Sequence, residues 1–419
     1  MLTSGSMPSI TSDFHLQPAA GGVLAAAGFQ GAGVAAGVKK RSGRPDVCII
    51  DAGEPVPSAA VFTSNLMAAP PVALSRRSVA DGYLRAWVVN SGNANACTGA
   101  PGLADATAMA AHTATALGCE PGDVAVASTG VIGVPLPMDR VSDGVARAVE
   151  SLGTSIGHDT ACAEAIMTTD TFAKSSACTV TTSDGTLYTV GGIAKGSGMI
   201  MPNMATMLAF LTTDAPLTSA ACDEVLRGAV DLTFNRITVD GDTSTNDTAA
   251  LMASGAAGDD PIEVDGPHYA AIAAAIHRVC ADLARAIVRD GEGATKLVSV
   301  TVRGAASVAD AESAARAIAN SPLFKTAIFG RDANWGRVAM AIGNSSARIE
   351  ADRVEIRFAG ITTCEMGMAV PFSEEEAAVA LERDEVEVVV DLHIGTAEAT
   401  VLTCDLSYEY VRINGEYRT

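Results

Sequence analysis

The chain has 419 residues, of which 48% are hydrophobic and only 4% aromatic, and its 28 Lys and Arg residues stand against 48 Asp and Glu, which gives a formal net charge of −20. This length is typical of two or three domains with a large core, and the apolar content excludes a disordered chain. The negative charge disfavours a nucleic-acid or anionic-membrane partner, because both require a basic protein face.

Helical and strand-like stretches alternate along the first half of the chain. Residues 21–38 are apolar over the length of a membrane span, but the segment consists largely of Gly and Ala and follows no basic region, so we expect a soluble, cytoplasmic protein. Residues 103–117 predict a helix that stops at Gly118, and residues 123–128 follow as a strand with alternating valines. This order is typical of an α/β unit.

The second half continues the alternation with more regular strands. A turn-rich stretch at 255–267 is a candidate sub-domain boundary. Residues 268–290 then predict a long amphipathic helix, and residues 297–303, 353–358 and 386–394 predict strands with apolar side chains at every second position. We find no repeat of solenoid length and no Pro-rich linker.

Metal chemistry has little support in the sequence. The nine cysteines are scattered without any Cys-x-x-Cys, so we interpret them as buried thiols of a reducing compartment, and the six histidines form no His-Glu-x-x-His motif. The acidic residues Asp240, Asp242 and Asp247 lack the glycine of a calcium loop. We interpret them as a hydrogen-bonded turn, with metal binding as a minority alternative, and expect neither a metal nor a cofactor.

Residues 195–215 combine a Gly- and Pro-containing loop with an apolar strand or buried helix, and Ala205 and Thr206 lie at the junction. The loop contains Gly196 and Gly198 but lacks the third glycine of a dinucleotide-binding turn, and Lys195 precedes the glycines, whereas a P-loop lysine follows them. From the residues alone, Thr206 could be a helix cap, as most threonines before apolar runs are.

The whole segment nevertheless resembles the autoprocessing block of the ornithine acetyltransferase family, also called glutamate N-acetyltransferase. Further blocks match in the family's order and cover nearly the whole chain. They begin at Asn90, Ser128, Ile166, Thr238, Asp290 and Asn334, and the last is the C-terminal Asn414 to Thr419. The sequence departs from the family at Ala333, where Pro is usual, and in its longer N-terminus, and neither difference touches a proposed site residue.

The resemblance implies that the precursor cleaves itself between Ala205 and Thr206, giving an N-terminal (alpha) chain of residues 1–205 and a C-terminal (beta) chain of residues 206–419. Thr206 would then be both the new N-terminus and the nucleophile. A threonine hydroxyl is a poor nucleophile at neutral pH, but a free α-amino group, with an ordinary pKa of about 7.7–8.0, places a base on the same residue. The resemblance thus implies an acetyl-Thr206 ester formed in ping-pong order.

The family also implies the other residues of the site. Its oxyanion hole corresponds to the Thr129 side chain and the Gly130 amide, although the residues alone also fit a plain strand-to-turn junction. The substrate contacts carried over from the family are Thr168, Lys195, Thr206, Glu292, Asn414 and Thr419. As a hypothesis, we assign Lys195 to a substrate carboxylate and Glu292 to a substrate ammonium, whereas most residues of these types are solvated at the surface.

The resemblance therefore implies an α/β (α+β) fold, with mixed sheets packed with helices in an αββα-like sandwich and a smaller C-terminal α/β domain. The implied activity moves an acetyl group from N²-acetyl-L-ornithine to L-glutamate in arginine biosynthesis, within an α2β2 or larger assembly of the two chains. The sequence leaves open whether acetyl-CoA is a second donor. The alternatives are an N-terminal-nucleophile aminopeptidase or amidase, an acetyltransferase of specialised metabolism, and a binding protein that has lost catalysis.

Overall fold

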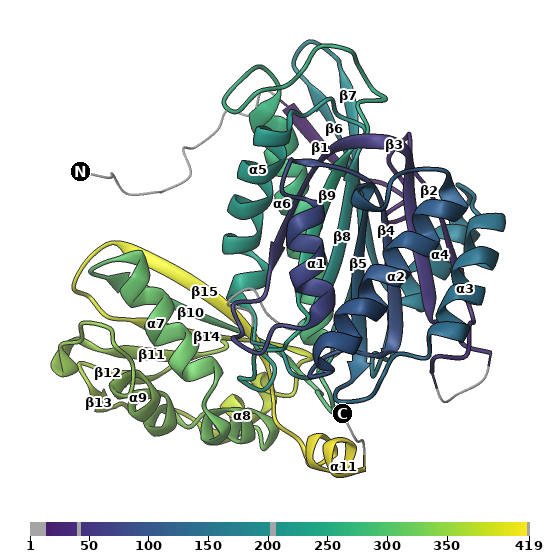
Figure 1. The fold of residues 1–419 in the computed structure, drawn as a ribbon. Coiled ribbons are helices and arrows are strands. Elements are labelled where there is room, and N and C mark those ends of the chain that lie inside the picture. Colours follow the sequence, from purple (N-terminus) through teal and green to yellow (C-terminus); the bar gives the residue numbers. More distant parts are fainter. Residues whose placement is uncertain (1–13, 40–42, 202–206, 417–419) are drawn as a thin grey trace.

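The computed structural model describes residues 14–39, 43–201 and 207–416, which form two β-sheets and the helices that cover them (Figure 1). The strands of the larger sheet are β1 (Phe14–Pro18), β2 (Gln30–Val34), β3 (Val47–Phe62), β4 (Tyr83–Asn93), β5 (Val124–Val131), β6 (Lys174–Thr182), β7 (Leu187–Lys195), β8 (Leu208–Thr213) and β9 (Thr248–Ala253). They are ordered β1-β6-β7-β8-β9-β3-β4-β5, with β2 also paired to β3.

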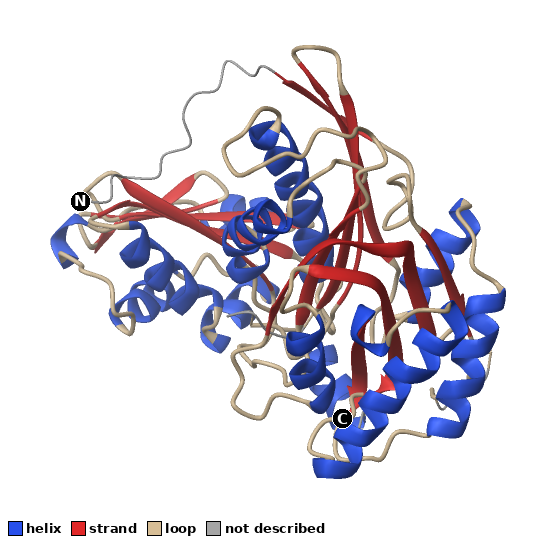
Figure 2. Cartoon of the chain, turned by 45° about the horizontal axis from the view of Figure 1, so that its top comes forward, coloured by secondary structure: helices blue, strands red, loops and turns tan. Residues whose placement is uncertain are grey.

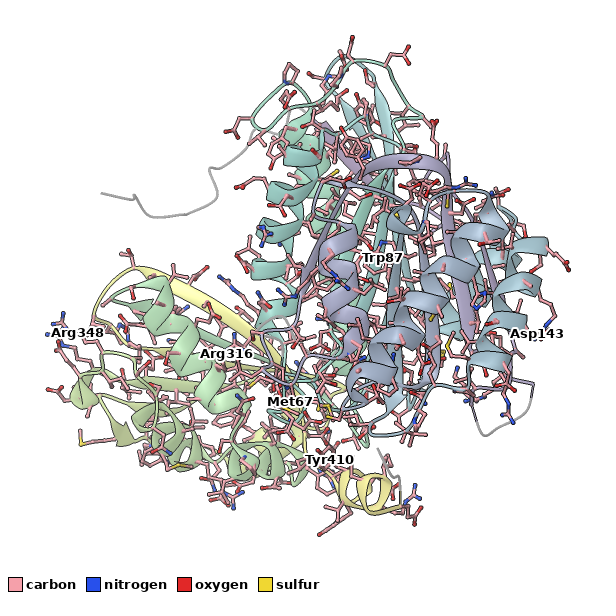
Figure 3. The ribbon with its side chains drawn as sticks, in the orientation of Figure 1. Met67, Trp87, Asp143, Arg316, Arg348 and Tyr410 are labelled. Carbon is pink, nitrogen blue, oxygen red and sulfur yellow. The ribbon has the colours of Figure 1, made fainter. Side chains whose placement is uncertain are left out.

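The larger sheet is doubled over at β3. The first part of β3 pairs with β2 and β4, and its last residues pair with β9, so this one strand belongs to both halves. Side chains alternate between the two faces of a strand, and the inward-facing residues of both halves meet in an inner core. Trp87 of β4, labelled in Figure 3, and Phe210 of β8 join the halves there, and their ring centroids are 5.3 Å apart.

Helices cover the two outer faces of the doubled sheet (Figure 2). On one side α5 (Ser219–Leu232) and α6 (Tyr269–Arg289) pack on β6 to β9, and on the other α2 (Gly99–Leu117) and α3 (Met138–Glu150) pack on β2 to β5. The shorter α1 (Pro70–Ser78) contacts β5, and α4 (Ile156–Ala165) contacts β2. These layers confirm the αββα-like sandwich that the resemblance implied.

The C-terminal part forms the smaller α/β unit that was expected. Its strands are β10 (Leu297–Ala305), β11 (Glu355–Phe358), β12 (Ile361–Glu365), β13 (Met368–Ala369), β14 (Glu385–Asp391) and β15 (Ala397–Cys404), and its helices are α7 (Val308–Ala319), α8 (Pro322–Phe329), α9 (Trp335–Gly343) and α10 (Glu374–Ala380). The sheet is mixed, because β10 pairs in parallel with β14 and antiparallel with β15. A last helix, α11 (Tyr408–Glu416), returns the chain to the sandwich.

Several local predictions compare directly with these elements. The helix predicted over 103–117 is α2, which begins earlier at Gly99 and ends where Gly118 adopts a left-handed φ of 72°. The turn-rich stretch 255–267 connects β9 to α6, which both belong to the sandwich, and the smaller sheet begins only at β10. The apolar segment 21–38 forms turns and the short strand β2, and no helix of the described residues has the length and apolarity to span a membrane.

Candidate active site

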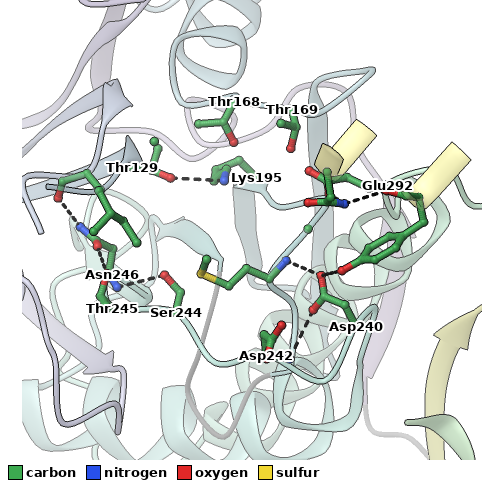
Figure 4. A pocket seen from close by; sticks show the side chains of 17 residues that line it. Thr129, Thr168, Thr169, Lys195, Asp240, Asp242, Ser244, Thr245, Asn246 and Glu292 are labelled. Atoms are coloured by element: carbon green, nitrogen blue, oxygen red, sulfur yellow. Dashed lines mark hydrogen bonds between the residues drawn. The ribbon is translucent and has the colours of Figure 1, made fainter. Parts of the chain in front are cut away.

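A pocket of about 240 Å³ lies where the sandwich, the loop after α6 and helix α11 meet (Figure 4). Every predicted site residue that the structure describes lines this pocket, and these residues are Thr129, Gly130, Thr168, Lys195, Glu292 and Asn414. The remaining predicted site residues lie outside the described ranges, and they are Ala205, Thr206 and Thr419. The structure thus brings together residues that the sequence spreads over nearly three hundred positions.

The predicted oxyanion hole lies at the end of β5, which runs parallel to β4 with Gly130 opposite Gly92. Gly130 has a left-handed φ of 131°, and a Cβ on it would lie 2.4 Å from the Gly92 carbonyl carbon, so this position requires glycine. The Thr129 hydroxyl oxygen accepts a hydrogen bond of 3.3 Å from Lys195 Nζ. Because an ammonium only donates, the hydroxyl proton of Thr129 stays available for an acceptor in the pocket.

A buried amide that sequence reasoning missed fixes this end of the sandwich. The Asn246 Nδ2 group donates to the carbonyl oxygens of Ala94, at 2.6 Å, and Ser128, at 2.9 Å. It therefore ties the chain after β4 to the residue that precedes Thr129. The available signal was its place in the family block that begins at Thr238, where we interpreted only the acidic residues, as a turn, and gave Asn246 no role.

Lys195, the last residue of β7, is a nearly buried cation in the pocket wall. Burial lowers the pKa of Lys195, and the charge of Asp170 opposes that effect. Burial would raise the pKa of Asp170, but the positive charges of Lys195 and Lys174 outweigh it and hold that pKa below its usual range. Lys195 is therefore no solvated surface lysine, and its charge depends on acidic neighbours.

Glu292 lies in the wall formed by the loop after α6, and it is also largely buried. Its Oε2 atom accepts a hydrogen bond of 2.8 Å from Asn414 Nδ2 on α11 (Figure 4). A Cβ on Gly198 would lie 2.4 Å from the Glu292 carboxyl carbon, so the glycine loop after β7 packs closely against this carboxylate. The pocket thus has a cationic wall at Lys195 and an anionic wall at Glu292.

The acidic turn expected near the site is present and borders the same pocket. Asp240 accepts backbone hydrogen bonds from Met199, at 2.6 Å, and Ile200, at 2.8 Å, and Tyr410 Oη donates to it at 3.3 Å. Burial raises the pKa of Asp240. Among the described residues, no group of three His, Cys, Asp or Glu side chains is arranged to hold a metal ion. Tyr410 had no signal in the sequence, because its role depends on how α11 docks.

Asp247 is buried beside the point where the described chain resumes. Within the described ranges its Oδ2 atom has no hydrogen-bond partner, and burial raises the pKa of Asp247 well above the usual range despite the opposing effects of Lys195 and the Met207 backbone N–H. Met207 directly follows Thr206 in the sequence. The structure therefore places a carboxyl group, which we had interpreted only as part of a turn, beside Met207, the first described residue after the predicted cleavage site.

The family match and the curated relatives agree over most of the chain. Residues 30–419 match the ArgJ family. The chain is 52% identical over 401 residues to "Arginine biosynthesis bifunctional protein ArgJ" of Symbiobacterium thermophilum, covering 96% of this chain and 99% of that protein. It is 51% identical over 394 residues to the protein of the same name from Geobacter sulfurreducens, covering 94% and 99%. A crystal structure of the Bacillus halodurans protein of that name is 46% identical, with a TM-score of 0.49, and covers 51% of this chain and 100% of that one.

Proposed function

The chain belongs to the ArgJ family, and on that premise we propose that it transfers an acetyl group from N²-acetylornithine to glutamate through Thr206. The proposal includes cleavage between Ala205 and Thr206, after which residues 1–205 and 206–419 form one catalytic unit in an α2β2 or larger assembly. It also includes a cytoplasmic place in arginine biosynthesis, and it involves no metal or resident cofactor.

The main support for the proposal is that the predicted catalytic and substrate-binding residues share one pocket. The predicted oxyanion donors Thr129 and Gly130 line the same pocket as the predicted substrate contacts Lys195 and Glu292. These residues come from β5, from the end of β7 and from the loop after α6, which are far apart in the sequence. A pocket that combines hydrogen-bond donors with a buried lysine and a buried glutamate suits acyl transfer between two charged amino acids.

The chemistry follows from these groups. After cleavage, the α-amino group of Thr206 takes the proton from its own hydroxyl, directly or through water, and the oxygen attacks the acetyl carbonyl carbon of acetylornithine. The Thr129 hydroxyl and the Gly130 amide stabilise the negative charge that develops on the carbonyl oxygen. Ornithine leaves with the returned proton, and the amine of glutamate then attacks the acetyl-Thr206 ester in the same way.

The competing proposal is an N-terminal-nucleophile aminopeptidase or amidase, because water can also attack an acyl-threonine. The two proposals differ in where the acetyl group goes. We expect acetylornithine and glutamate together to give ornithine and N-acetylglutamate in equal amounts, with little free acetate, as measured by quantitative mass spectrometry. Acetate as the main product, whether or not glutamate is present, would identify a hydrolase and contradict the transferase.

The same assay addresses a second donor. The curated relatives are named bifunctional, and we extend the proposal to acetyl-CoA as an alternative source of the acetyl group on Thr206. Replacing acetylornithine by acetyl-CoA is expected to give N-acetylglutamate and free CoA. If glutamate is acetylated by acetylornithine but not by acetyl-CoA, the enzyme has one donor only.

The anionic wall predicts a selective effect of Glu292→Gln. Loss of the charge is expected to raise KM for acetylornithine roughly tenfold, because its ammonium group loses a charged hydrogen bond, while KM for glutamate changes little. Steady-state kinetics with each substrate varied in turn measure both values. Glu382→Gln, which removes an exposed carboxylate paired with Arg331, is the matched control. Equal KM values for wild type and Glu292→Gln with both substrates would refute the assignment.

A further inference from the structure

A cluster of buried charges lies directly behind the pocket. Lys174 Nζ, at the start of β6, donates to Asp170 Oδ1 at 2.6 Å and to Asp290 Oδ2 at 2.5 Å. The Lys174 and Asp170 side chains are fully buried, and that of Asp290 is 2% exposed. Charges are rarely buried so completely unless they are paired, and this cluster belongs to none of the groups assigned to the reaction.

The cluster connects three segments that line the pocket. Asp170 accepts backbone hydrogen bonds from Thr168, at 2.9 Å, and from Gly196, at 2.7 Å, so it joins the loop before β6 to the loop after β7. The Asp290 carbonyl oxygen accepts a hydrogen bond of 2.6 Å from the Ser197 hydroxyl. The Ser197 carbonyl oxygen in turn accepts from the Glu292 backbone N–H at 2.9 Å.

The charges within the cluster do not balance. Two carboxylates, Asp170 and Asp290, face one ammonium, Lys174, which leaves one negative charge in a region without solvent. A further cation is Lys195, which immediately precedes the Gly196 amide bound by Asp170 and is itself 5% exposed. The excess negative charge of the cluster therefore acts on Lys195 at low local dielectric, where such effects are large.

We propose that Asp170 is a positioning residue that keeps Lys195 in its charged ammonium form, so that Lys195 binds a substrate carboxylate at the pocket wall. Asp170 acts through Lys195 and the Gly196 amide and touches no substrate itself. This inference rests on the proposed function, because that function assigns the carboxylate to Lys195.

The other acidic groups around Lys195 do not replace Asp170. Glu292, which lines the same pocket, is the carboxylate assigned to the substrate ammonium. Asp247 attracts Lys195, but its own burial favours the neutral acid. Asp170 has the largest attractive effect on Lys195 of these groups, and it remains ionised because Lys174 and Lys195 stabilise its charge.

The neighbouring cations disfavour the protonated form of Lys195. Lys174 repels the Lys195 ammonium. Lys39 and Lys195 repel one another, and burial is the main reason why the pKa of Lys39 is lowered to about 8. Among these groups, Asp170 is therefore the one that most favours the protonated form of Lys195.

The test is the titration of the Lys195 amine by NMR in protein labelled with ¹⁵N- and ¹³C-lysine. The lysines are few, at positions 39, 40, 174, 195, 296 and 325, and a Lys195→Arg sample identifies the signal. Asp170→Asn is expected to lower the pKa of Lys195 by about one unit or more, because a favourable charge is lost. Lys174→Gln removes a repelling charge and is expected to raise the pKa of Lys195. The two substitutions thus shift this pKa in opposite directions, which general damage to the fold would not do.

Asp51→Asn is the matched control, because Asp51 is a buried carboxylate paired with Arg85 at 3.0 Å in the sandwich, away from the pocket. It is expected to leave the Lys195 titration unchanged. In kinetics, carboxylate binding is lost as the pH rises through the pKa of Lys195, so the rise of KM for glutamate should begin at lower pH in Asp170→Asn, with little change in kcat.

The outcomes separate this inference from the proposed function. An unchanged Lys195 titration in Asp170→Asn would overturn the role of Asp170, even if the wild-type enzyme transfers acetyl groups. Shifted titrations in a protein without transfer activity would support the electrostatic coupling and contradict the proposed reaction instead. If Asp170→Asn does not fold, titration of the Asp170 carboxyl carbon in wild-type protein labelled with ¹³C-aspartate decides the question. An ionised Asp170 at neutral pH is expected, and a neutral Asp170 would overturn its role.

Discussion

Thr206→Ala is expected to give a single uncut chain without acetyl transfer activity. The alanine removes the hydroxyl that attacks the Ala205 carbonyl carbon during cleavage and the acetyl carbon during turnover, and without cleavage no α-amino group is released to act as base. Loss of an activated nucleophile lowers kcat by about 10³-fold or more in comparable acyl-transfer enzymes. Denaturing gel electrophoresis measures the cleavage, and ornithine release measures the activity.

Thr206→Ser is the matched variant, because it keeps the hydroxyl and loses only a methyl group. It is expected to be cleaved at the same bond and to retain measurable transfer. An alanine variant that is cleaved at residue 205 as efficiently as wild type would remove Thr206 from the cleavage reaction, and one that transfers acetyl groups at the wild-type rate would remove it from catalysis.

Thr129→Val is expected to lower kcat by about 10²–10³-fold with little change in KM, because the loss of one oxyanion donor acts mainly in the transition state. Valine has nearly the shape of threonine, so the pocket wall keeps its volume. The hydrogen bond from Lys195 to Thr129 is also lost, and Thr129→Ser restores both the donor and this acceptor. Steady-state kinetics on the cleaved protein measure the effect.

The control is Thr113→Val in α2, which removes a buried hydroxyl that donates to the Met109 carbonyl oxygen, away from the pocket. It is expected to alter stability without altering kcat. Wild-type kcat in Thr129→Val, or an equal loss in Thr113→Val, would contradict the assignment of Thr129 to the oxyanion hole.

The sequence predicted the regular elements where the periodicity is strong and the length sufficient. The helix over 268–290 corresponds to α6, and the strand over 297–303 corresponds to β10, because apolar side chains recur there at the period of the element. The edge strand β1 was missed, because it has only five residues and its apolar face consists of Phe14 and Leu16 alone, both partly buried. The pairing of β3 with β9 depends on contacts between distant segments, which no local pattern reports.

In the site, too, residues within a recognisable sequence block were predicted, whereas those that act through distant contacts were not. The glycine at 130 belonged to a recognisable block, and the structure explains it by the close approach of Gly92. The roles of Asp170 and Asn246 could not be predicted, because their partners lie on other loops and only the folded chain brings them together. An aspartate four residues before a lysine is an ordinary surface pattern, and only its burial makes the interaction strong.

The most direct test of acetyl transfer through Thr206 is the intact mass of the purified wild-type protein before and after incubation with N²-acetylornithine, without glutamate. We expect two fragments, residues 1–205 and 206–419, with one acetyl group added to the second fragment only and lost again when glutamate is supplied. A single uncut chain that still transfers acetyl groups, or an acetyl group on the fragment 1–205, would contradict it.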